Sequence, residues 1–376
     1  MKKSLNNDLT IDNSFIDFFT IIFPIAILGV NYILYNALMI SQLKLIMRAS
    51  AISLLLFGMI ARKKTYVNIF QLFFILLILL QFIINGSIAL NIGAAIIFAI
   101  CNKFDNQKTE SIMFKINLAL VGLMLILLLL GRVENYTYIS TTGRIRSTLG
   151  FDNPNVSALF YSSSIFMFLL SRTEIRTVHC VVAFILESIV YYFTDSRTSF
   201  FSLLIFILLL LLYKFNKSRA VENITIVIID LFFALNLISV FTIDKFMKVD
   251  TLLSGRISSF IRMIDDSGIK GFWLGGTKNT VDNFYYMFLF NYGIIMYIYI
   301  AVTVHYCLKK LNSQKSYKEV AFIVSYFALG FMESSIIRPE IISVLMIWKL
   351  IVNSQQLVYD SNNLSNKINM ENKYEN

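Results

Sequence analysis

The chain has 376 residues, of which 57% are hydrophobic and only 15% are charged, and its mean hydropathy is +0.69. Soluble domains are roughly 45–50% apolar and about 25% charged, so this composition excludes an ordinary soluble protein. A net charge of +10 is also compatible with a nucleic-acid partner. In a protein with many membrane spans such a charge mainly reflects orientation, so we expect no nucleic acid to bind.

Apolar runs recur along nearly the whole chain, and most are long enough to cross a hydrocarbon core of about 30 Å. Backbone groups must be paired inside lipid, so helices are expected throughout, and the three prolines leave most of them unbroken. The predicted fold class is all-α, a polytopic membrane bundle that forms one domain over residues 1–355. About twelve spans are expected, over 19–40, 46–61, 66–84, 87–101, 112–131, 155–171, 177–194, 198–213, 221–241, 284–307, 319–336 and 340–353.

The basic residues predict the orientation of this bundle. The first residues are polar and acidic, with no short apolar core before a cleavage site, so the first span is expected to be retained. If the N-terminus is cytoplasmic, the dense basic clusters all fall in inner loops, as the charge bias of membrane proteins requires. The three cysteines then lie at inner span ends, where thiols stay reduced. The C-terminus is also expected in the cytoplasm, and residues 356–376 are expected to form a disordered polar tail.

Two long loops, about 132–154 and 242–283, are predicted on the outer side, together with a short turn near Asp195. These outer segments hold arginines that lie beside Gly, Ser or Thr close to a helix end: Arg144, Arg146, Arg197 and Arg256. Guanidinium binds phosphate oxygens in a bidentate fork, so one interpretation is an outward-facing site for an anionic, lipid-linked substrate. The other interpretation is that these are solvated loop charges or side chains that reach lipid headgroups.

The triplet Asn153-Pro154-Asn155 has a structural interpretation of its own. Asn is favoured at a helix N-cap and Pro at the first helical position, so the triplet predicts the start of the sixth span.

Three stretches, in this order, resemble the Wzy-type polymerases of bacterial O-antigen and capsule synthesis, within the O-antigen ligase and polymerase superfamily. The first, residues 144–155, has two arginines, a Gly-Phe pair and the Asn-Pro-Asn triplet. The second, residues 194–200, holds a Ser-Arg-Thr turn before an apolar span. The third runs from residues 254–256 through Gly275-Gly276 to 281–285 and 292–295, like the family's large outer loop and following span. The likeness covers roughly residues 130 to 300 and implies a GT-C-like membrane fold.

One position favours the polymerase branch over the ligase branch. Ligases of this superfamily carry a functional histidine just before the Asn-X-Tyr stretch that enters the span after the large loop. Asp282 stands at that place in this chain, and the two histidines, His179 and His305, fall at predicted cytoplasmic span ends. Asn153 similarly stands where many relatives have histidine.

The resemblance implies a metal-independent, inverting glycosyl transfer between two undecaprenyl-diphosphate-linked saccharides at the outer face of the bacterial cytoplasmic membrane. It needs neither cofactor nor ATP, and its implied partners are membrane lipid, a flippase and a chain-length regulator. The four arginines are candidates for stabilising the leaving diphosphate. Asp282 is the leading candidate for the base, and Asp195 and Asp265 are the alternatives. Candidate substrate-binding residues complete the implied site: Asn153, Asn155, Asp195, Ser196, Asn283, Tyr285 and Glu333.

Other functions remain open from the sequence. A polysaccharide ligase would use the same donor and a different acceptor, and a lipid-linked oligosaccharide flippase would tend to have repeated halves and broken helices at the membrane centre. Glu187 and Asp230 fall near the middle of predicted spans, where a charge is costly. They are expected either to line the sugar cavity or move protons, or to be hydrogen-bonded packing residues.

Overall fold

The computed structural model describes residues 16–354, apart from 62–66, 87–88, 103, 140–142, 217, 251–254 and 278–279. The predicted tail over 356–376 lies outside the described residues. A helix occupies each of the predicted spans. These helices are η1–α2 (Phe18–Ile22 and Phe23–Asn36), α3 (Leu43–Ala61), α4 (Ile69–Asn85), α5 (Ala89–Cys101), α6 (Asn106–Leu129), α7 (Pro154–Leu170), α8 (Thr177–Thr194), α9 (Arg197–Phe215), α10 (Arg219–Ser239), α12 (Phe284–Ser313), α13 (Tyr317–Leu329) and α14 (Ile342–Asn353).

Seven helices of the described chain are at least 18 residues long and apolar enough to cross a membrane, and shorter apolar helices accompany them. Their lipid-compatible faces carry exposed Leu, Ile, Phe and Val side chains, whereas the centre of the bundle is formed by α13 and α14, which are almost fully buried, and by α12, which is mostly buried. Exposed apolar side chains in such number are expected of a surface that faces lipid rather than water. The protein is therefore a helical, membrane-embedded protein.

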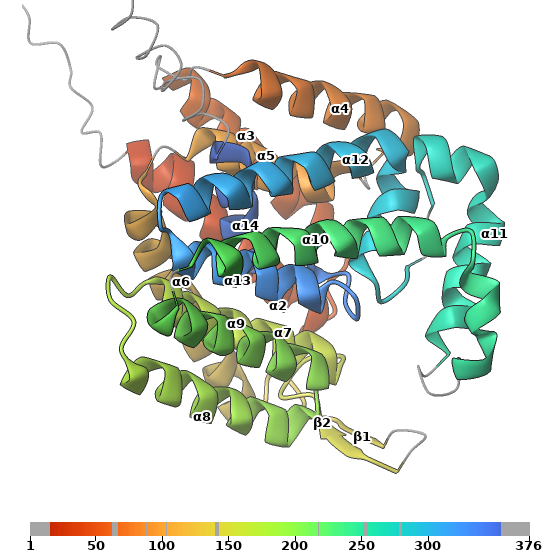
Figure 1. Cartoon of the computed structure of the whole chain (residues 1–376). Helices are drawn as coiled ribbons and strands as arrows, with labels where there is room; N and C mark the ends of the chain where they lie inside the picture. The colour runs from red at the N-terminus through yellow and green to blue at the C-terminus, as the bar shows by residue number, and fades with distance from the viewer. Residues whose placement is uncertain are drawn as a thin grey trace, which may run out of the picture.

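The helix ends gather at two opposite ends of the bundle. At one end, Asp152 N–H just before α7 donates to Asn36 O at the close of α2, over 2.8 Å. At the other end, Lys318 Nζ at the start of α13 donates to Leu170 O at the close of α7, over 2.8 Å. We call the first end, which carries β1–β2 and α11, the hairpin end, and the second the tail end. Figure 1 shows β1–β2 and α11 together at the right-hand side of the view.

Both long loops contain secondary structure that the sequence analysis did not predict. In the first, β1 (Thr137–Ile139) and β2 (Ile145–Ser147) form an antiparallel hairpin in which Tyr138 pairs with Arg146. In the second, η3 (Ile243–Val249) and the 19-residue α11 (Arg256–Leu274) are folded, with a break in α11 at Gly268. The described chain is all-α apart from this one short hairpin, as predicted, and the second loop is largely helical.

Three predicted boundaries are also corrected. Helix α12 continues to Ser313 instead of ending near residue 307, and it contains a sharp break at Gly293 (φ 79°, ψ 167°). Helix α13 ends at Leu329 instead of near residue 336. Residues 330–341 therefore form a turn at the hairpin end, and Glu333 lies in this turn rather than inside a span.

Candidate functional site

The start of α7 brings the first predicted residues together. Asn153 caps the helix by accepting the Asn155 N–H at its Oδ1 over 2.8 Å, and Pro154 is the first helical residue, as the sequence predicts. This cap leaves the side chain of Asn155 free to accept a hydrogen bond from Arg146 Nη2 at 2.5 Å. Strand β2 is thereby fixed against α7 through one of the predicted arginines.

The second predicted turn, between α8 and α9, meets the same hairpin. Arg146 Nε donates to Thr194 O over 2.8 Å, and Arg144 Nη1 forms an ion pair with Asp195 Oδ2 over 2.7 Å. Asp195 has a left-handed backbone conformation (φ 45°, ψ 36°), a conformation that Asp adopts more readily than most residues. Residues about 50 positions apart in the chain are therefore neighbours, as the predicted site requires.

Ser196 and Arg197 have different surroundings. Ser196 is buried at the N-cap of α9, and its N–H donates to Thr194 Oγ1 over 3.3 Å. Arg197 is exposed as the first residue of α9. Its positive charge lowers the pKa of the Arg146 guanidinium. Ser196 therefore has the contacts of a positioning residue, whereas Arg197 is accessible to a ligand.

Glu333 lies where the arginines meet the last turn of the bundle. It is buried, and its Oε1 accepts no hydrogen bond from the residues that the structure describes. Burial raises the pKa of its carboxyl to about 7, and the charge of Asp282 acts in the same direction. Three cations oppose this shift: Arg338, Arg256 and Arg146. The charges that act on this buried acid therefore come from the hairpin, from α11, from the residue just before the cap of α12 and from the 330–341 turn.

Arg256 is the first residue of α11, after Gly255 in a left-handed conformation (φ 77°). Its Nη1 donates to Met332 Sδ over 3.1 Å, which places it beside the residue that precedes Glu333. A thioether is a weak acceptor, so this contact leaves the charge of the guanidinium available to an anion.

A polar cavity of about 390 Å³ opens beside this group at the hairpin end. Its wall is built from the end of α2, the starts of α3, α5, α7 and α12, and the 330–341 turn. Charged side chains of both signs line it: Lys44, Arg48 and Arg338, with Asp152, Asp282 and Glu340. Asparagine and tyrosine side chains supply further polar groups there, so the cavity offers hydrogen-bond partners on several sides.

Two predicted residues, Asp282 and Asn153, line this cavity. Asp282 is exposed, one residue before the cap of α12, and its charge acts on that of Glu333. Asp152, the residue before Asn153, lines the same cavity. Partial burial raises the pKa of its carboxyl, and the charge of Arg338 opposes this shift. The site therefore has two exposed carboxylates, Asp152 and Asp282, and a buried one, Glu333.

Asn283 and Tyr285 have packing contacts instead of a place on the cavity wall. Asn283 caps α12 by accepting the Tyr286 N–H over 2.9 Å, and its Nδ2 donates to Phe331 O over 3.1 Å. Tyr285 is fully buried, and its hydroxyl donates to Phe327 O over 2.8 Å. Asn283 holds α12 against the turn that carries Glu333, and Tyr285 holds it against the end of α13, so their contribution to the site is positional.

The sequence analysis missed several residues that line the cavity. Arg48 is almost fully buried near the start of α3, where its Nε pairs with Glu340 Oε1 and its Nη1 with Asn91 Oδ1. Lys44 Nζ lies 3.4 Å from the centre of the Tyr35 ring. Arg48 could have been found, because an arginine inside an apolar stretch is costly and usually functional. Arg338 falls in the final outer turn of the predicted topology, whereas Lys44 carried no comparable signal.

No family model matches the chain, and neither a curated protein nor a solved structure matches it. The function of this protein is therefore inferred from the geometry of the hairpin end and from the resemblance of the motifs.

Proposed function

We propose that the protein is a polysaccharide repeat-unit polymerase of the Wzy type, in a GT-C-like bundle that crosses the bacterial cytoplasmic membrane about twelve times. The hairpin end faces outward, and both termini lie in the cytoplasm. The single observation that carries the proposal is the gathering of arginines around Glu333 beside an open polar cavity lined by Asp282.

The proposed orientation is supported by the loops of the tail end. The connections from α7 to α8, from α9 to α10 and from α12 to α13 all lie there, and they carry lysines and arginines. Short cytoplasmic loops have such an excess of basic residues. The arginines of the hairpin end have no such topological reason, so binding of an anion accounts for them better.

The proposed donor is a growing glycan on undecaprenyl diphosphate. The charges of Arg256 and Arg338 act on Glu333, and Arg197 is exposed near Arg146, whose pKa its charge lowers. Arginine forks of this kind hold phosphate oxygens and stabilise the negative charge that develops on a departing diphosphate. Arg144 and Arg146 already have protein partners, so their role is to fix the hairpin and add positive potential.

The proposed acceptor is the terminal sugar hydroxyl of a new lipid-linked repeat unit, held in the polar cavity. Asp282 takes the hydroxyl proton as the acceptor oxygen bonds to the anomeric carbon of the donor. The bond from that carbon to the diphosphate oxygen breaks, and undecaprenyl diphosphate leaves with the electron pair. Attack from the side opposite the leaving group inverts the configuration at that carbon. The glycosyl diphosphate carries the required energy, so the step needs no nucleotide.

A ligase is the second candidate, because it shares the donor. His179 caps the first turn of α8 at the tail end, where its Nδ1 accepts the Arg176 N–H over 3.1 Å. His305 lies partway along α12, and this corrects the expectation that it marks a span end. Neither histidine lines the cavity, whereas Asp282 does. This difference favours the polymerase.

Deletion of the gene, followed by gel analysis of the surface glycan, tests the proposal. A polymerase defect leaves single repeat units attached to their final acceptor. Accumulation of long polymer on the lipid carrier would identify a ligase, and accumulation of lipid-linked units on the cytoplasmic face would identify a flippase. Restoration by the wild-type chain, and not by Asp282→Asn, would connect the phenotype with the site.

A further inference from the structure

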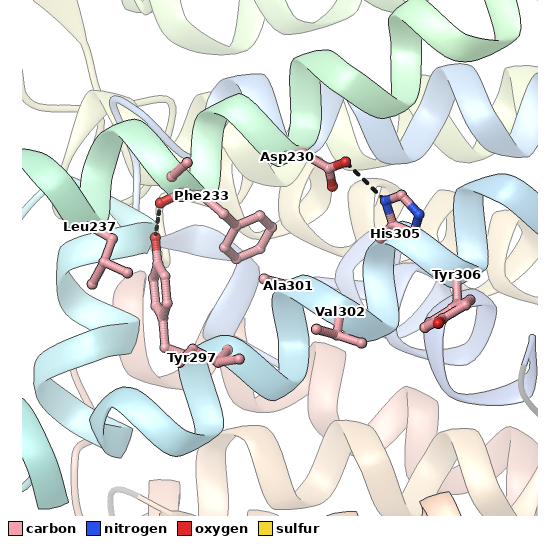
Figure 2. Close-up of a pocket in the computed structure, with 10 residues that line it drawn as sticks. Asp230, Phe233, Leu237, Tyr297, Ala301, Val302, His305 and Tyr306 are labelled. Atoms are coloured by element: carbon pink, nitrogen blue, oxygen red, sulfur yellow. Dashed lines mark hydrogen bonds and ion pairs between the residues drawn. The ribbon is translucent and has the colours of Figure 1, made fainter.

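Several ionisable side chains of the helices have a partner within the chain. Figure 2 shows Asp230 on α10 pointing toward His305 on α12, and Asp230 Oδ2 lies 2.9 Å from His305 Nδ1. Glu187, which lies within α8, is buried and accepts a hydrogen bond from Ser162 over 2.8 Å. Both acids are therefore paired, and neither lines the polar cavity of the hairpin end.

Lys44 has no such partner, although it lies in the wall of the polar cavity. It is the second residue of α3 and is partly buried. Its Nζ lies 3.4 Å from the centre of the Tyr35 ring, and it forms no ion pair or hydrogen bond with the residues that the structure describes. The face of a ring attracts a cation without neutralising it, so the charge of Lys44 remains available to an anion.

The charges around Lys44 are mainly of its own sign. Arg48 and Arg338 repel its ammonium group, and Glu340 attracts it. Glu340 is already the ion-pair partner of Arg48, so one carboxylate serves more than one cation. Like charges that are close together and withdrawn from water repel strongly, so an anion bound beside Lys44 would stabilise all three cations.

Neither topology nor lipid contact explains this lysine. The loop between α2 and α3 lies at the hairpin end, which the proposed orientation places outside, where the charge bias of membrane proteins requires no basic residues. A lysine that anchors a helix extends its ammonium group to the lipid headgroups. The Lys44 side chain instead lies over Tyr35 at the cavity wall, so binding of an anion there accounts for it better.

A second group beside Lys44 also lacks a partner. Asn31 is buried in α2, and its Nδ2 donates to Lys44 O over 3.3 Å. Asn31 lines the cavity, and its Oδ1 accepts no hydrogen bond from the described part of the chain. A buried acceptor without a partner is costly, and a sugar hydroxyl is a donor that satisfies it. An unpaired cation beside an unpaired amide oxygen fits a saccharide that carries an acidic group.

We propose that the acceptor is an acidic saccharide, and that Lys44 binds the acidic group of the sugar that enters the cavity. The inference rests on the proposed polymerase function and names the class of its acceptor. Asp282 lines the same cavity of about 390 Å³, so the reacting hydroxyl and the acidic group must lie on one sugar or on adjacent sugars. The diphosphate of the acceptor is separated from that hydroxyl by the oligosaccharide and does not meet this requirement. The carboxylate of a uronic acid or the phosphate of a phosphorylated sugar does.

Binding of small saccharides to the purified protein tests the proposal without turnover. The probes are methyl β-glucuronide, glucose 6-phosphate and the neutral methyl β-glucoside, each titrated in detergent solution by calorimetry. We expect at least one of the two anionic sugars to bind about tenfold or more tightly than the glucoside, the effect of one hydrogen bond to a charged group. The tighter of the two distinguishes a carboxylate from a phosphate. Equal binding of all three sugars overturns the proposal.

Lys44→Gln connects this preference with Lys44 rather than with the other cations of the hairpin end. The variant should lose the preference, whereas Lys44→Arg keeps the charge and should keep it. Lys309→Gln is a matched control, because Lys309 is exposed at the tail end of α12. An undiminished preference in folded Lys44→Gln contradicts the proposal.

A labelling experiment on the wild type needs no variant that might fail to fold. The preferred anionic sugar should protect Lys44 from acetylation by acetic anhydride, measured by mass spectrometry, and should leave Lys309 unprotected. Acetylation of Lys44 at the same rate with and without the sugar overturns the proposal.

The outcomes separate this inference from the proposed function. A Lys44-dependent preference for an acidic sugar, in a protein that forms no polymer, would keep the saccharide site and reject the polymerase. Polymer growth from a repeat unit of neutral sugars, at the same rate in the wild type and Lys44→Gln, would keep the polymerase and reject the acidic acceptor. Binding of inorganic pyrophosphate that depends on Lys44 would assign this lysine to a diphosphate and overturn the inference.

Discussion

The exposed carboxylate of Asp282 and the buried carboxylate of Glu333 lie close enough for the charge of the first to raise the pKa of the second. The two acids therefore have different roles available at neutral pH. Asp282 opens into the cavity, where a base must reach a hydroxyl, whereas Glu333 lies among the arginines and sets how much positive charge they present.

The raised pKa of Glu333, about 7, predicts a pH dependence of anion binding. Below this pH the carboxyl is mostly neutral, and the full charge of the arginines is available. Above it, the carboxylate offsets part of that charge, so binding should weaken as the pH rises through 7. Between pH 6 and pH 8 we expect a change of roughly tenfold in the dissociation constant for undecaprenyl diphosphate.

Glu333→Gln is the control for this effect. Titration of the ligand itself is common to both proteins, so the comparison isolates the residue. The variant should bind as tightly at pH 8 as the wild type does at pH 6, after correction for the ligand. The same pH dependence in both proteins would refute the role of Glu333.

Arg338→Ala and Arg256→Ala should each leave the protein inserted and stop most polymer growth. Removal of one preorganised donor to a developing negative charge typically costs about 10²–10³ in rate. Arg132→Ala is a matched control, because Arg132 is exposed just before the hairpin and belongs to neither the Glu333 group nor the cavity wall. Repeat-unit polymer would be measured by gel in membranes with equal amounts of each variant. Normal chain lengths in both test variants would remove the assignment.

Asp282→Asn should separate binding from chemistry. The amide keeps the shape of the side chain but cannot accept the hydroxyl proton, and loss of a general base costs about 10²–10⁴ in rate. Donor binding, measured with undecaprenyl diphosphate, should stay within a fewfold of the wild type. A variant that polymerises at the normal rate would exclude Asp282 as the base.

Gly293 is a position at which we expect any larger residue to destabilise the protein. Its backbone conformation is almost restricted to glycine, and an added Cβ would lie 2.4 Å from Trp273 O. The break frees the carbonyl groups of Asn291 and Tyr292, which accept hydrogen bonds from Gly276 N–H and Gln81 Nε2. Gly293→Ala should therefore loosen α11 from α12 and destabilise the protein by at least about 1–3 kcal/mol.

Gly122→Ala provides the comparison for this variant. Gly122 lies within α6, and a Cβ there meets no atom within 4 Å. Alanine is the better helix former, so this change should leave the midpoint of thermal unfolding unchanged or raise it. A midpoint for Gly293→Ala no lower than that for Gly122→Ala would show that the close approach of α11 is not required.

The orientation is testable with single cysteines at the two ends of the bundle. Ile145→Cys in β2 is exposed at the hairpin end, and Gln314→Cys is exposed between α12 and α13 at the tail end. A membrane-impermeant thiol reagent added to intact cells should label the first and spare the second until the membrane is opened. The reverse pattern would place the candidate site in the cytoplasm.

The sequence predicted the positions of the helices well because each carries an apolar run, and in seven of the described helices this run is long enough to cross a membrane. It did not predict α11, whose buried residues Ile257, Phe260 and Met263 form a short stripe in a polar segment. A search for apolar runs does not detect such an amphipathic helix, although its period is visible in the sequence. The strands of the hairpin are three residues long and carry too little pattern to be recognised.

Parts of the site that depend on local motifs could be predicted from the sequence, whereas parts that depend on long-range packing could not. The Asn153 cap follows from a motif of three adjacent residues, and the meeting of the hairpin with the turn at Asp195 was expected from the order of the motifs. The cavity wall combines α3 with the last turn of the chain, as in the pairing of Arg48 with Glu340. Residues almost 300 positions apart meet only through the packing of the whole bundle, so no local motif indicates them.

Reconstitution of the purified protein with synthetic undecaprenyl-diphosphate-linked repeat units tests the central claim most directly. The account predicts a ladder of polymer and release of one undecaprenyl diphosphate per bond formed, without nucleotide. It also predicts that Arg338→Ala and Asp282→Asn abolish the ladder, whereas Arg132→Ala preserves it. A folded wild-type protein that forms no polymer from its native repeat unit, or a ladder of normal length from both site variants, would contradict it.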